Sequence, residues 1–130
     1  MKTILTTLGI SLLVLAGCTS QKQTESNFIQ ENIDNAVAQE TLQTDIIEKS
    51  GKILNPRTID KDGNIVYVPI DDWCSGFFPG NIWHMYELTG DQKWLPLAEK
   101  YTEDLDSVQY LTWHHDVGFM IGSSYLNGYR

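Results

Sequence analysis

An aspartate follows two adjacent histidines near the end of the sequence, in the stretch Trp113-His114-His115-Asp116. No lysine or arginine adjoins Asp116, so nothing in the local sequence neutralises its carboxylate. Such a group is a candidate acid, base or charge stabiliser in catalysis. The alternative is that Asp116 caps a helix beginning at Val117, and both roles can hold together.

The two histidines differ in the role that we expect for them. His114 and His115 are neighbours, so in regular structure their side chains point in different directions and do not share one metal ion. We therefore expect no metal site and no cofactor. His115 is expected to line a pocket beside Asp116 and to donate a hydrogen bond to a ligand, while His114 packs or faces water.

Aromatic residues accompany this stretch and recur in residues 73–80, which read WCSGFFPG. Flat rings in turn-rich surroundings favour a sugar ligand. Aromatic residues at helical spacing are mostly core residues, so only those at loop edges are expected to reach a ligand. On this ground Phe78 and Trp113 are predicted to contact the substrate.

The elements that must position these residues are mainly helical. Apolar residues at helical spacing predict helices over 27–47, 75–88 and 91–108, and a further helical stretch from Val117. Gly90 suits a left-handed helix cap. Helices joined by short loops are typical of an all-α fold built from helical hairpins.

A short β-hairpin is predicted before the second of these helices. The Asn55-Pro56 step is expected to end the first helix, because the residue before a proline is pushed out of the helical conformation. The segment 60–64 contains an Asp-Gly step between β-branched residues at 58–59 and 65–68, which indicates a tight turn between two strands.

The N-terminus has the pattern of a lipoprotein signal. A single lysine precedes an apolar run from Ile4 to Leu15, which is shorter than the roughly 20 residues that span a bilayer. Leu15-Ala16-Gly17-Cys18 then forms a lipobox. We predict a signal peptide over 1–17, lipid attachment at Cys18, a flexible tether over 18–26, and a body held on the periplasmic or cell-surface side of a membrane. An ordinary secretory signal with an incidental cysteine is the alternative.

The charge balance excludes one class of partner. The sequence has 17 acidic and 9 basic residues, a net charge of −8. Binding to nucleic acid needs clustered lysines and arginines that replace counterions, so no nucleic-acid partner is expected. An anionic sugar remains compatible, because a local site can be positive within an acidic body.

Three segments together, residues 72–80, 86–91 and 115–120, resemble in order the motifs of the glycoside hydrolase family 88 unsaturated glucuronyl hydrolases. The resemblance extends over about residues 56–130. It implies an (α/α)6 barrel, of which residues 27–130 would form the incomplete N-terminal part. It also implies that the substrate is an unsaturated oligosaccharide that lyases release from glycosaminoglycans or related polymers.

The resemblance also assigns roles to residues. Asp116 would be the first of two essential aspartates, and His115 and the region of Phe78 would border the subsite for the unsaturated uronic acid. The second aspartate follows some tens of residues later in that family, so it is expected beyond Arg130. The segment alone is then expected neither to close a barrel nor to be active.

Two other functions remain open at this point. The neighbouring family of unsaturated rhamnogalacturonyl hydrolases has the same fold and chemistry, although the motif at residues 73–80 suits the first family better. A non-catalytic, helical, glycan-binding lipoprotein of the outer membrane is the alternative from a different class. It has no need of a carboxylate beside the histidines.

Overall fold

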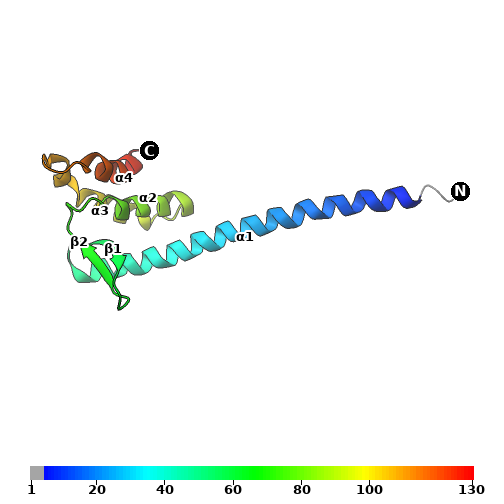
Figure 1. Cartoon of the computed structure of the whole chain (residues 1–130), viewed down its shortest axis with the longest axis horizontal. Coiled ribbons are helices and arrows are strands. Elements are labelled where there is room, and N and C mark those ends of the chain that lie inside the picture. Colours follow the sequence, from blue (N-terminus) through cyan, green and yellow to red (C-terminus); the bar gives the residue numbers. More distant parts are fainter. Residues whose placement is uncertain (1–4) are drawn as a thin grey trace. The chain divides into compact units, whose positions relative to one another are not determined.

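The computed structural model describes the backbone of residues 5–130 and the side chains of Glu25 and residues 27–130. The first helix, α1, covers Leu5–Ser50 (Figure 1). The expected start at Asn27 is therefore wrong, because no glycine or proline interrupts residues 18–50. The helix also includes residues 18–26, for which a tether was predicted. The predicted signal over 1–17 and lipid attachment at Cys18 concern side chains outside the described residues and stay predictions.

The chain divides into two compact units, residues 1–36 and 37–130. In the first unit, Gln30 Nε2 donates a hydrogen bond to Asp34 Oδ1, one helical turn along, at 2.9 Å. Among the described residues, no helix is both long and apolar enough to cross a membrane. The second unit holds the remaining elements and all of the predicted site.

A left-handed glycine ends α1. The helix stops at Ser50, and Gly51 has a φ of 63°, a conformation that favours glycine after a helix. The predicted stop at Asn55-Pro56 comes four residues too late, and these two residues instead begin strand β1 (Asn55–Ile59). Gly51, and not Pro56, is therefore the residue that ends the helix.

The predicted β-hairpin is confirmed. Strand β1 pairs antiparallel with β2 (Ile65–Val68), with a register shift between Pro56 and Thr58. In the turn, Asp60 Oδ1 accepts hydrogen bonds from the backbone nitrogens of Asp62 and Asn64, each at 2.9 Å. Gly63 supplies the positive φ, 84°, that this turn requires.

Two antiparallel helices follow the hairpin, α2 (Phe77–Thr89) and α3 (Trp94–Glu103). The predicted cap at Gly90 is confirmed, since its φ is 66° and its nitrogen donates to the Tyr86 carbonyl at 2.8 Å. Pro96 lies in the first turn of α3, where its missing N–H is not needed. The predicted continuation to residue 108 instead tightens into a 3-10 helix, η1 (Asp106–Tyr110).

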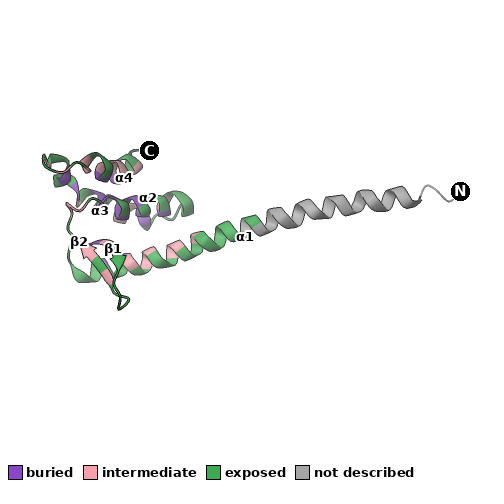
Figure 2. Ribbon diagram, in the orientation of Figure 1, coloured by how far each residue is buried: buried purple, intermediate pink, exposed green. Residues whose placement is uncertain are grey.

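The last helix, α4 (Val117–Tyr129), completes a core with α2 and α3. Buried residues are concentrated in these three helices (Figure 2). The most enclosed apolar side chains, each at most 1% exposed, are Ile82, Trp94, Ala98, Leu105, Val108 and Met120. The predicted all-α class with one short β-hairpin is therefore confirmed.

An ion pair attaches the end of α1 to α3. Glu48 accepts hydrogen bonds from Lys100 Nζ at 2.6 Å and from Tyr101 Oη at 2.7 Å. These two bonds lower the pKa of Glu48 below its ordinary value. Ile47, one position earlier in α1, is 2% exposed, so its aliphatic side chain adds buried apolar surface to this attachment.

Two glycines allow α2 to lie unusually close to α4. A Cβ on Gly76 would overlap the Met120 carbonyl oxygen, and a Cβ on Gly80 would overlap the Ser123 carbonyl oxygen. These glycines are four residues apart, so they lie on one face of the first turn of α2. Residues 76–80 therefore set the distance between the two helices whose N-terminal ends carry the predicted site.

Candidate functional site

The loop between η1 and α4 ends at Asp116, the residue immediately before the last helix. Asp116 takes the N-cap position of α4, but its side chain makes no capping hydrogen bond. Its backbone carbonyl accepts from the nitrogens of Phe119 at 2.9 Å and Met120 at 3.0 Å. Asp116 therefore occupies the capping position without capping the helix through its side chain. Its carboxylate is available for other contacts near the positive end of the helix dipole.

Asp116 is tied to both histidines. Its backbone nitrogen donates to His114 Nδ1 at 3.1 Å, so a neutral His114 ring carries its proton on Nε2. Its Oδ2 lies 3.3 Å from His115 Nε2. The Asp116 side chain is 32% exposed and that of His115 is 91% exposed. The imidazole of His115 is therefore accessible, while the carboxylate is partly enclosed.

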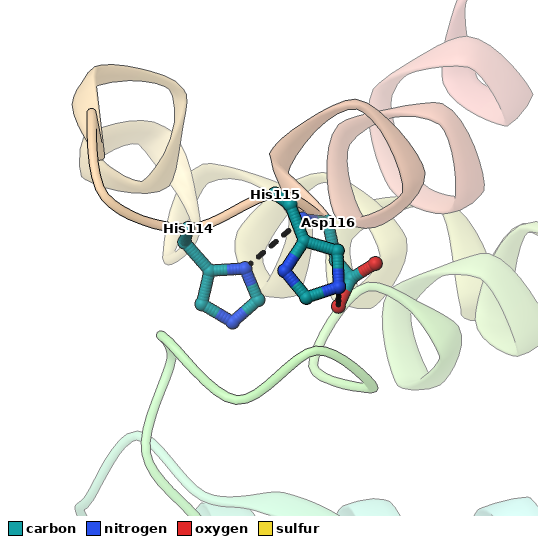
Figure 3. Close-up of side chains that lie close together, drawn as sticks. All are labelled: His114, His115 and Asp116. Atoms are coloured by element: carbon teal, nitrogen blue, oxygen red, sulfur yellow. Dashed lines mark hydrogen bonds and ion pairs between the residues drawn. The ribbon is translucent and has the colours of Figure 1, made fainter.

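Both imidazoles lie near Asp116 in the structure, and the expectation that the two histidines do not share one metal ion stays a prediction. The rings of His114 and His115 stack with an interplanar angle of 17° and centroids 5.8 Å apart (Figure 3). One donor atom from each histidine and one from Asp116 lie within 4.8 Å of one another. The two histidines lie in a loop, so the side-chain directions of a helix or strand do not apply. Two imidazoles and a carboxylate are donors that suit a transition-metal ion.

An exposed aromatic cluster stands at the N-terminal ends of α2 and α4. We define it as Trp73, Phe77 and Phe119. Phe77 contacts Trp73 and Phe119 edge to face, with ring centroids 6.0 and 5.1 Å apart. Each of the three residues is 40–49% exposed. Phe119 follows Asp116 by less than one turn of α4, so the cluster and the carboxylate belong to one surface.

Phe78 lies in the core, where the sequence argument did not expect it. It is 4% exposed, and its ring packs on Tyr101 with centroids 4.8 Å apart. It is inside α2 rather than at a loop edge, on the same helical face as the buried Ile82 and Met85. That spacing was visible in the sequence and would have selected Phe77 for the surface. The sequence offered no comparable spacing argument that Phe119 is exposed at the site.

Trp113 lies in a loop, as predicted. It is 68% exposed, and its ring centroid is 5.1 Å from that of His114. The structure therefore places Trp113 beside His114 and His115 beside Asp116, whereas Phe78 lies in the core. The contacts of these residues with a substrate stay predictions.

Asp72 connects the β-hairpin to this region. Its Oδ2 pairs with Arg57 Nη1 at 2.9 Å, and its Oδ1 accepts from the Cys74 nitrogen at 3.2 Å. Burial acts to raise the pKa of Asp72, but hydrogen bonds from Cys74 and the electrostatic effects of the nearby Arg57 and His114 outweigh it, so the pKa is lowered. Asp72 is thus a charged turn residue near the imidazole of His114.

The buried thiol of Cys74 is kept protonated by the same surroundings. Burial, together with the neighbouring Asp72, raises its pKa to about 11. A nucleophilic cysteine needs a lowered pKa, so this environment suits a small buried residue and not a reactive thiol. Cys74 is accordingly buried, with 8% of its surface exposed.

Comparison with known proteins shows similarity to one group of enzymes. An unsaturated glucuronyl hydrolase of Formosa agariphila is 37% identical over 76 residues, which are 58% of this chain and 19% of that enzyme. One from Bacillus sp. strain GL1 is 39% identical over 69 residues, 48% of this chain and 18% of that enzyme. No protein-family model matches the chain.

A solved structure gives the same result for the fold. The crystal structure of an unsaturated glucuronyl hydrolase specific for heparin is 45% identical and superposes with a TM-score of 0.57, covering 59% of this chain and 21% of that one. The resemblance to the unsaturated glucuronyl hydrolases is therefore confirmed, as is a helical fold consistent with part of a helical barrel. The chain spans about a fifth of the length of these relatives.

Proposed function

We propose that this protein contributes to an unsaturated glucuronyl hydrolase, which removes a 4,5-unsaturated uronic acid from lyase-generated oligosaccharides of glycosaminoglycans or related polymers. The observation that carries the proposal is the carboxylate of Asp116, which makes no capping hydrogen bond to α4. It lies beside an accessible histidine and an exposed aromatic cluster, within a segment that is similar to such enzymes. A glycan-binding protein without catalysis has no need of this carboxylate.

The chemistry follows from the substrate. A 4,5-unsaturated uronyl residue is a vinyl ether, so a general acid protonates C4 and positive charge develops at C5 and the ring oxygen. Water then adds at C5, the resulting hemiketal opens, and the rest of the oligosaccharide is released. Because the anomeric carbon is not attacked, the usual relation between carboxyl separation and stereochemistry does not apply.

In this proposal Asp116 stabilises the charge that develops at C5. A fixed carboxylate beside a developing cation acts without reorganisation in the transition state. His115, whose Nε2 lies 3.3 Å from Asp116 Oδ2, orients that carboxylate and donates to the substrate. The aromatic cluster supplies a flat apolar surface for the sugar. In this proposal the proton donor is a second carboxyl group.

The decisive experiment uses the protein at the full length that its gene encodes. Unsaturated chondroitin disaccharide is added, and the ultraviolet absorbance of its conjugated double bond is followed. Asp116→Asn should lower turnover by about 100-fold or more while leaving the circular dichroism spectrum unchanged. The exposed Asp45 of α1 offers a matched control, because Asp45→Asn removes a carboxylate outside the site. Wild-type absorbance that never falls would exclude the hydrolase.

We further propose that the protein is anchored to the cell envelope by lipid at Cys18. The support is the lipobox Leu15-Ala16-Gly17-Cys18 behind a short apolar run. Two or more acyl chains are sufficient for stable membrane attachment. Cys18→Ala should move the protein from the membrane fraction to the soluble fraction and remove the mass of the lipid. An unchanged distribution would refute the anchor.

A further inference from the structure

The ring of His114 is held between its neighbours in the loop before α4. It stacks on the ring of His115 with centroids 5.8 Å apart, and its centroid lies 5.1 Å from that of Trp113. His114 is half-buried, whereas the His115 side chain is 91% exposed. His114 is therefore placed to contact the protein, and His115 is the histidine that a ligand can reach.

The polar contact of His114 is with the backbone of Asp116. Asp116 directly precedes α4, so its N–H has no acceptor in an earlier turn of a helix. In a capping box, a Glu or Gln side chain three residues later accepts from this N–H. That position holds Phe119, which has no acceptor in its side chain. His114 Nδ1 accepts instead at 3.1 Å, the contact drawn as a dashed line in Figure 3.

This hydrogen bond restrains the carboxylate of Asp116. It fixes the peptide between residues 115 and 116, and the orientation of that peptide sets the direction of the Cα–Cβ bond of Asp116. The carboxylate makes no capping bond to α4, and its Oδ2 lies 3.3 Å from Nε2 of the exposed His115. The restraint from the half-buried side of the loop therefore comes from His114.

We propose that His114 is a positioning residue of the candidate site. Through Nδ1 it holds the Asp116 peptide and so directs the carboxylate, without touching the substrate itself. A carboxylate that stabilises a developing charge must be in place before the reaction, and a misplacement of about 1 Å can lower a rate about 100-fold. The inference rests on the proposed function, because it assigns His114 to the same reaction.

Two substitutions separate the hydrogen bond from the packing of the ring. Asn and Asp side chains commonly accept from the N–H two residues later, which is the same spacing as from His114 to Asp116. His114→Asn therefore keeps an acceptor but removes the ring. His114→Phe keeps a ring against Trp113 and His115 but removes the acceptor. If His114 only packs, the phenylalanine variant is the better substitute.

Kinetics of the full-length protein with unsaturated chondroitin disaccharide compare the two variants. His114→Phe should lower kcat by about 10- to 100-fold and change KM by less than about twofold, because His114 does not bind the substrate. His114→Asn should keep kcat within about threefold of wild type. His84→Phe is the matched control, since the His84 side chain of α2 is 51% exposed and lies outside the site. A phenylalanine variant as active as wild type, or more active than the asparagine variant, would overturn the inference.

The hydrogen bond is also tested in the wild-type protein without turnover. Histidine labelled with nitrogen-15 is incorporated, and the signals that disappear in His114→Asn are assigned to His114. The imidazole nitrogen shifts should show a protonated Nε2 and an unprotonated, accepting Nδ1. A proton on Nδ1 of the neutral ring would overturn the inference, because that nitrogen could not accept from Asp116. This measurement needs no variant to fold like wild type.

The two measurements distinguish this inference from the proposed function. An active wild type in which His114→Phe keeps its full kcat refutes the positioning role alone. A wild type with the proton on Nε2 that turns over no unsaturated substrate refutes the hydrolase, and with it a role of His114 in that reaction.

Discussion

Gly76→Ala should destabilise the second unit by forcing α2 away from α4. The added Cβ would overlap the Met120 carbonyl oxygen and would lie 2.8 Å from both the Met120 Cα and its carbonyl carbon, whereas ordinary contact begins at 3.4 Å. All three atoms belong to the backbone of α4, so no side-chain rotation relieves the overlap. Overpacking of this kind costs about 1–3 kcal/mol, and the rigidity of both helices favours the upper end.

A second glycine in the same pair of helices provides the control. Gly122 lies within α4, and a Cβ placed on it meets nothing within 4 Å. Gly122→Ala should therefore stabilise the unit by about 0.5–1 kcal/mol, because alanine loses less backbone entropy than glycine in a helix. The two variants make the same chemical change with opposite expected signs.

Urea denaturation followed by circular dichroism measures both effects. With a urea dependence of about 1 kcal/mol per molar for a small domain, Gly76→Ala should lower the midpoint by about 2–3 M. Its near-ultraviolet spectrum should also change, since Trp73 would lose its fixed position against Phe119, whose ring centroid is 6.4 Å away. If Gly76→Ala is as stable as wild type, the close approach of α2 and α4 is refuted.

Two further predictions follow from ionisable groups of the second unit. The pKa of Glu48 is lowered in the folded state by Lys100 and Tyr101, so the unfolded state binds a proton first as the pH falls; stability should decline below about pH 4.5, and Glu48→Gln should flatten that decline in urea titrations at several pH values. A decline of equal slope in the variant would assign the effect to other groups. The pKa of Cys74, about 11, leaves little thiolate near neutral pH, so in a Cys18→Ser background a thiol reagent should react about 100-fold more slowly with the folded protein than in urea. Equal rates would contradict the burial of this thiol.

The local sequence determined most of the elements. Gly63 and Gly90 are required by backbone conformations that other residues rarely adopt, and the Asp-Gly turn and the helix end were predicted on that basis. Helical spacing located α2, α3 and α4 to within a few residues. The end of α1 was misplaced because Gly51, and not the later proline, has the left-handed conformation. Turns, helix ends and helical spacing depend on residues close together in the chain, so they can be predicted from a single sequence.

Only the tertiary structure decided which side chains meet. The sequence identified Asp116 and His115 as chemical candidates, but it chose Phe78 where the packing of α2 on α3 leaves Phe77 exposed. The ion pair between Glu48 and Lys100 joins residues 52 positions apart, and the contact of Phe77 with Phe119 depends on the close approach that Gly76 permits. Spacing along a chain specifies the face of a helix on which a residue lies. The distance between two helices depends instead on the size of the side chains where the helices cross. Which residues lie at that crossing is known only from the tertiary structure.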